Sequence, residues 1–220
     1  MSLSLFGQYK TLKLPEIDKN ESIALTKFTE WENETSSEFN ILKLSTDTTY
    51  EEHYRISEGR QIIEVYKIGN KYYGQIISFT HTYVEYKKRN KKKSKLLFQN
   101  CEIAADTAEQ IFKKFKELDN VPDQKSIDGW SNGCDGRIYT IEYANKQEYL
   151  LRNYWTPKVQ SDSITHKAVI LDLINYIYVE LNFYEYYERF IQTLPAGDYT
   201  DGFLNISKSR RKRHRTKNRW

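Results

Sequence analysis

The chain has 220 residues, of which 39% are apolar, and 18 Tyr and 10 Phe make it rich in aromatic rings. This load of rings excludes an intrinsically disordered chain and suffices for one ordinary domain with a largely aromatic core. The net charge of +4 is unevenly spread, because residues 208–220 hold eight Lys and Arg, residues 87–95 hold seven, and neither stretch holds an acid. The remaining body, with 19 basic and 30 acidic residues, is acidic and carries two basic patches.

Two cysteines, Cys101 and Cys134, are too few to define a disulfide framework and are expected to be unrelated thiols.

The first ten residues, MSLSLFGQYK, lack the basic start and the long apolar stretch of a secretory signal. The most apolar window, AVILDLINYIYVEL, is interrupted by charged residues, so no membrane span is predicted. The localisation stays unknown: the sequence as given indicates a cytoplasmic protein, and a removed leader would indicate a cell-envelope or secreted one.

In chain order, residues 1–38 are expected to form an N-terminal arm that is irregular or partly helical. Pro15 ends any first element, and Asn20 can cap a helix. From Phe39 the hydrophobic period changes to two, which predicts strands at FNILKL, HYRISE and QIIEVYKI.

A hairpin is the clearest local prediction, because Gly69 and Asn70 separate QIIEVYKI from a second alternating run, KYYGQIISFTHTYVEYKK. The basic stretch at 87–95 either extends this ribbon or loops out, and KLLFQNCEI resumes as a strand. A helix is then predicted over DTAEQIFKKFKEL, where Asp106 stands at the cap and an apolar stripe follows. This helix ends before Pro122.

Two more elements complete the chain. RIYTIEY and EYLLRNYW, joined by ANKQ, predict a second hairpin. Ser163 can cap a long helix whose apolar residues recur at steps of three and four, and FYEYYERFIQTL continues this helix or forms a second one. This order predicts an α+β fold: an antiparallel β-sheet of hairpins with a C-terminal helix and a second helix packed on one face. The expected domains are the arm at 1–38, a single α+β domain at 39–207 and a basic C-terminal tail at 208–220.

The loop SIDGWSNGCDG at 126–136 has two interpretations, an active-site loop or a tight turn. It does not match a calcium loop, because the third position from Asp128 is Trp130 and the twelfth is Tyr139. Its three glycines and its Asp-Gly pair favour the turn. The four histidines show no triad or metal-ligand spacing, so no catalytic residue, metal or cofactor is predicted. A hydrolase-like site would use Asp128, Cys134, Asp135 and Glu142.

The stretch DGRIYTIEYANKQEYLLRNYWTP resembles a loosely defined set of small bacterial α+β domains of unassigned function. Their pattern is Asp-Gly, an alternating strand with a Glu, a short turn, a Tyr-containing strand and a Trp/Tyr-Pro end before a final helix. The resemblance covers about residues 50–195 and implies a secreted or lipid-anchored protein or part of a bacterial conflict system. The chain departs from the pattern in lacking a visible signal and in carrying a basic tail. The matching residues are Asp135, Gly136, Glu142, Tyr149, Tyr154, Trp155 and Pro157.

The basic segment and the tail supply candidate residues for binding nucleic acid or an acidic partner. Arginine suits bidentate contacts to phosphate, and a terminal Trp can stack on a base or fill a protein pocket. These residues are Lys91, Lys92, Lys93, Arg210, Arg211, Lys212, Arg213, Arg215, Arg219 and Trp220.

Three functions remain open. The surplus of Tyr and the missing catalytic motif favour a non-catalytic interaction protein that binds another protein, as an inhibitor, an immunity factor or an assembly subunit does. The alternative is a nucleic-acid-associated protein that uses the basic segment and the tail. The second alternative is an uncharacterised hydrolase-like enzyme.

Overall fold

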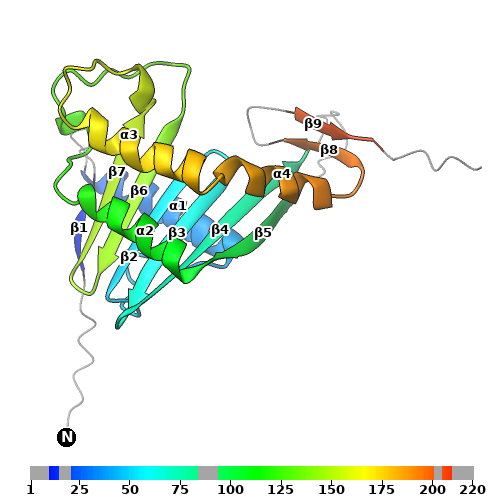
Figure 1. Ribbon diagram of the computed structural model, residues 1–220, viewed down its shortest axis with the longest axis horizontal. Coiled ribbons are helices and arrows are strands. Elements are labelled where there is room, and N and C mark those ends of the chain that lie inside the picture. The colour runs from blue at the N-terminus through cyan, green and yellow to red at the C-terminus, as the bar shows by residue number, and fades with distance from the viewer. Residues whose placement is uncertain (1–9, 15–20, 84–93, 201–204, 210–220) are drawn as a thin grey trace, which may run out of the picture.

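The structure, a computed structural model, describes residues 10–14, 21–83, 94–200 and 205–209 (Figure 1). These residues form one nine-stranded sheet in the order β1-β7-β6-β2-β3-β4-β8-β9, with β5 also paired to β4. All pairs are antiparallel except β1 with β7, so the predicted α+β class with a mostly antiparallel sheet is confirmed. The strands are β1 (Thr11–Lys13), β2 (Glu52–Glu58), β3 (Gln61–Ile68), β4 (Lys71–Thr82), β5 (Leu96–Ile103), β6 (Ile138–Asn145), β7 (Glu148–Trp155), β8 (Gly197–Thr200) and β9 (Asn205–Lys208).

Two tight turns set the register of the central strands. Gly69 and Asn70 connect β3 to β4 where the sequence predicts a two-residue hairpin, and Gly59 and Arg60 make a similar connection between β2 and β3. Both glycines have a positive φ, of 45° at Gly59 and 57° at Gly69, which such turns require. The two turns therefore fix which side chains of β2, β3 and β4 lie opposite one another.

Four α-helices are described, and they cover both faces of the sheet (Figure 1). The front face carries α2 (Ala105–Glu117), α3 (Lys167–Asn175) and α4 (Phe183–Thr193), and the back face carries α1 (Glu21–Phe39). The main core lies on the front, where Tyr54 of β2 stacks on Phe115 of α2 with ring centroids 5.0 Å apart. None of the described helices combines the length and the hydropathy that crossing a membrane requires.

The back face is covered by α1, which lies almost wholly in the stretch expected to form an irregular or partly helical arm. Ile62 and Ile77 point to this face and are covered by Phe39, the last residue of α1. The predicted strand FNILKL is wrong, because Phe39 ends a helix and residues 40–44 form no strand. Leu44 is fully buried against Ala144 of β6, so the apolar residues of this stretch pin a loop to the sheet.

The C-terminal helix is broken rather than continuous. A π-helical turn, Tyr176–Glu180, follows α3, and Asn182 adopts a left-handed conformation with φ 51° before α4 begins. Farther on, the Nζ of Lys208 donates hydrogen bonds to the carbonyls of Ile191, Gln192 and Leu194 at the end of α4. Lys208, the first residue of the predicted basic tail, is thus the last residue of β9 and caps a helix.

Candidate functional site

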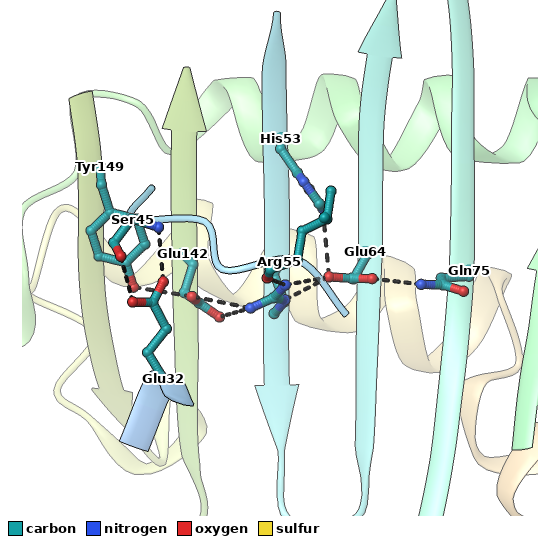
Figure 2. A network of polar contacts seen from close by, with 9 residues as sticks. Glu32, Ser45, His53, Arg55, Glu64, Gln75, Glu142 and Tyr149 are labelled. Carbon is teal, nitrogen blue, oxygen red and sulfur yellow. Dashed lines mark hydrogen bonds and ion pairs between the residues drawn. The ribbon is translucent and has the colours of Figure 1, made fainter. Parts of the chain in front are cut away.

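Two cross-strand rows of side chains organise the back face. The charged rung consists of Glu142 on β6, Arg55 on β2, Glu64 on β3 and Gln75 on β4, each directly opposite the next (Figure 2). The aromatic rung lies two residues nearer the β3–β4 turn and consists of His53, Tyr66 and Tyr73, again directly opposite one another. Because side chains alternate along a strand, both rungs share one face.

The charged rung is held by Arg55, which uses all three of its guanidinium nitrogens. Its Nε donates to Oε1 of Glu64 at 2.7 Å, and its Nη1 donates to both carboxylate oxygens of Glu142 at 3.3 and 3.2 Å. Its Nη2 donates to the carbonyl of Leu42 at 2.7 Å and lies 2.6 Å from Oε1 of Glu64. All three charged side chains are at most 3% exposed. The charges are thus paired and hydrogen-bonded, as burial requires.

Each carboxylate of the charged rung has one more neutral donor. The amide of Gln75 donates to Oε2 of Glu64 at 2.6 Å, and the hydroxyl of Tyr149 donates to Oε1 of Glu142 at 3.0 Å (Figure 2). Burial opposes ionisation of Glu64, but the charge of Arg55 outweighs it and leaves the pKa of Glu64 below its ordinary value. At Glu142 burial prevails over Arg55 and raises the pKa. Both oxygens of each glutamate already have donors, so the charged rung is a closed network.

Helix α1 is tied to the same face through a polar contact. The carboxylate of Glu32 accepts hydrogen bonds from the backbone N–H of Ser45, at 2.8 Å, and from its hydroxyl (Figure 2). Glu32 is 2% exposed. This contact and the bond from Arg55 to Leu42 hold residues 40–50 across the back face.

The aromatic rung lies in a cleft of about 740 Å³. Tyr50, from the loop before β2, stacks on Tyr66 with ring centroids 4.1 Å apart, and Tyr66 stacks on Tyr73 at 5.5 Å. Burial, together with the neighbouring Tyr66, raises the pKa of Tyr50 to about 12. Tyr73 is 40% exposed, so the row of stacked rings runs from the buried floor of the cleft to its surface. Other described lining residues include Leu42, Asn70, Glu102, Ile103 and Asp106.

His53 begins the aromatic rung and also lines the cleft. It is 3% exposed, and neither of its ring nitrogens has a hydrogen-bond partner among the described residues. Its Nε2 lies 3.6 Å from Oε1 of Glu64, beyond hydrogen-bond length. Burial lowers the pKa of His53 to about 4, so the ring is neutral at neutral pH. A neutral imidazole has one donor and one acceptor, and both are left unmade here.

The residues named for a hydrolase-like site are not gathered in one place. Asp128, Cys134 and Asp135 are exposed in the loop before β6, whereas Glu142 is fully buried in the charged rung. Both cysteines are free thiols. Among the described residues, no group of three or more His, Cys, Asp or Glu is arranged to hold a metal ion.

Two glycines of this loop pack closely against Trp155 of β7. A Cβ at Gly133 would lie 2.6 Å from two ring carbons of Trp155, and one at Gly136 would lie 2.1 Å from Oγ1 of Thr156. The backbone N–H of Arg137 also donates to Oγ1 of Thr156 at 3.0 Å. Close packing therefore accounts for these glycines without a ligand.

The candidate residues for nucleic acid lie outside the described part of the chain. Lys91, Lys92 and Lys93 fall in 84–93, and the tail residues Arg210, Arg211, Lys212, Arg213, Arg215, Arg219 and Trp220 fall in 210–220. Their role in binding nucleic acid or an acidic partner stays a prediction.

The sequence analysis did not identify the two rungs, although the register of two tight turns contains part of the information. The hairpin through Gly69 and Asn70 places Glu64 opposite Gln75 and Tyr66 opposite Tyr73 once its register is counted out. Recognising the two-residue turn at Gly59 and Arg60 would also have placed Arg55 opposite Glu64. The partner on β6 lies 87 residues from Arg55, and local pattern does not identify it. Comparison of the chain with protein-family models, with curated proteins and with solved structures finds no match to any of them.

Proposed function

We propose that the protein is a non-catalytic interaction protein that receives part of another protein in the cleft over the aromatic rung. The observation that carries this proposal is the contrast within the cleft: stacked rings reach its surface, and the buried His53 has no hydrogen-bond partner among the described residues. Buried polar groups without partners cost free energy, and a bound group or water relieves that cost. Tyrosine is enriched at protein interfaces because it combines a large apolar ring with a hydrogen-bonding end.

The charged rung supports a binding role over acid–base chemistry. Of its two carboxylates only Glu64 lines the cleft, where it accepts hydrogen bonds from Arg55 and Gln75. A general base works best with a pKa near the operating pH, whereas the pKa of Glu64, despite its burial, is held below its ordinary value by Arg55. Glu64 therefore acts as a fixed floor of the cleft and helps to keep Arg55 in place.

The test is a quantitative pull-down with the full-length protein from cells that naturally produce it. Tyr73→Ser removes the exposed end of the aromatic rung, and Tyr83→Ser is a matched control, because Tyr83 follows the far end of β4 and is 45% exposed. At least one protein should be recovered in stoichiometric amount with the wild type and with Tyr83→Ser, and lost with Tyr73→Ser. If every recovered protein survives Tyr73→Ser, the cleft is not the binding site and the proposal is wrong.

A further inference from the structure

The aromatic rung stops at Tyr73 because the neighbouring strand stops beside it. The last residue of β5, Ile103, lies opposite Gly74, so among the described residues no strand pairs with Tyr73 on that side. One face of the Tyr73 ring stacks on Tyr66, nearly parallel at 14°. Tyr73 is 40% exposed and lines the cleft, and no second ring among the described residues stacks on it.

Two exposed carboxylates line the same cleft as Tyr73. Glu102 lies opposite Gln75 on β5, diagonally across from Tyr73 on the same face, and Asp106 lies in the first turn of α2. Both are exposed, and neither makes an ion pair or a side-chain hydrogen bond with a described residue. The single lysine among the described lining residues is Lys71, so this end of the cleft is acidic.

A partly exposed aromatic ring beside carboxylates that have no partner among the described residues favours a cation, and the flat face of the ring favours a planar one. A guanidinium group is planar, stacks on an aromatic face and carries five donors that match carboxylates, whereas an ammonium is a compact, strongly hydrated charge. Resting on the proposed function, we propose that this end of the cleft binds an arginine side chain of the partner protein. The guanidinium stacks on the face of Tyr73 away from Tyr66 and donates to Glu102 and Asp106.

The site can be tested without knowing the partner. The probe is N-acetyl-arginine N-methylamide, titrated into the isotope-labelled full-length protein at low salt while backbone amide shifts are followed by NMR. N-acetyl-citrulline N-methylamide has nearly the same shape without the charge, and N-acetyl-lysine N-methylamide has the charge without the planar group. The arginine probe should shift amides of β4, β5 and the start of α2, and bind at least tenfold more tightly than either of the others.

Variants then assign the contacts. Tyr73→Leu keeps apolar bulk but removes the π face, and Glu102→Gln with Asp106→Asn removes two charges; each should weaken the arginine probe about tenfold or more. The matched control, Asp128→Asn with Asp135→Asn, removes the same charge from the exposed 126–136 loop and should leave the affinity within twofold. The amide spectrum of each variant shows directly whether it is folded.

Four results would overturn the inference. Equal binding of the citrulline or lysine probe removes the guanidinium from the assignment, and unchanged affinity in both cleft variants moves the site elsewhere. Tighter probe binding after replacement of the tail arginines by glutamine would assign the site to the chain's own tail instead of a partner. If no arginine probe binds while the pull-down stays dependent on Tyr73, the cleft still binds a partner but not through arginine, so the two proposals fail separately.

Discussion

The charged rung and the aromatic rung lie two residues apart on the same three strands, and their environments are opposite. In the charged rung, Arg55 pairs with both carboxylates, and each charged group has a further hydrogen-bond partner. In the aromatic rung, the ring of His53 has no hydrogen-bond partner among the described residues, and the ring of Tyr73 reaches the surface. Groups that are already paired have little to offer a ligand, whereas a buried polar group without a partner gains free energy when a ligand supplies one. This difference is why we propose that a partner binds at the aromatic rung.

The largest expected effect breaks the charged rung. Arg55→Met leaves Glu64 and Glu142 buried without a cation, so the free energy of unfolding should fall by about 3–5 kcal/mol, as measured by urea denaturation. Adding Glu64→Gln and Glu142→Gln to Arg55→Met should recover much of this loss, because no buried charge remains. A loss below about 1 kcal/mol for Arg55→Met alone would mean that the charged rung does not lock the sheet.

The next effect comes from His53 and depends on pH. Its pKa is about 4 in the folded protein and near 6.5 when unfolded, so between these values the unfolded chain takes up a proton that the folded protein does not. Stability should therefore be full above pH 6.5 and fall by roughly 3 kcal/mol as the pH drops to 4. His53→Phe should flatten this part of the curve. Parallel curves for the wild type and the variant would contradict the assignment.

A third change tests whether the 126–136 loop, which packs against Trp155, contributes to stability as the charged rung does. Gly136→Ala places a methyl group 2.7 Å from Nε1 of Trp155 and 2.1 Å from Oγ1 of Thr156, so the chain must shift. The free energy of unfolding should fall by about 1–3 kcal/mol. Asp135→Ala, at an exposed neighbour, should change it by less than about 0.5 kcal/mol. Equal tolerance of both changes would show that the loop is not packed as described.

The smallest expected effect is in the open part of the aromatic rung. Tyr73→Leu keeps most of the apolar contact with Tyr66 and removes no buried polar group, so thermal unfolding should report a loss below about 1 kcal/mol. Partner binding should nevertheless be lost. A large loss of stability would mean that Tyr73 is needed for folding, and the two rungs would then not differ in role.

Local pattern was enough for much of the scaffold. The turn at Gly69 and Asn70 lies between β3 and β4, and the amphipathic run that begins at Asp106 forms α2, although this helix starts at Ala105 and Asp106 is not its cap. Such elements are set by short-range periodicity and turn chemistry, which a single sequence carries.

Features that depend on distant parts of the chain could not be predicted in the same way. The alternation after Phe39 has the period of a strand, but the end of α1 and a loop pinned through Leu44 occupy those residues. The sequence of α1 is rich in Glu and has no regular apolar stripe, so its pattern does not predict a long helix. Glu142 was named as a member of a hydrolase-like group and of the bacterial-domain pattern, but not as a partner of Arg55, because the two residues become neighbours through the pairing of β2 with β6.

The pairing of β2 with β6 also bears on how the chain folds. Arg55 and Glu142 are separated by 87 residues, so β2 and β3 are synthesised, and can form their hairpin, well before β6 exists. Contacts this distant are slow to close. During that interval β2 is an edge strand, and a charged side chain on its face opposes pairing with another molecule. We therefore expect Arg55, which pairs with both carboxylates in the finished sheet, also to disfavour aggregation of the unfinished one.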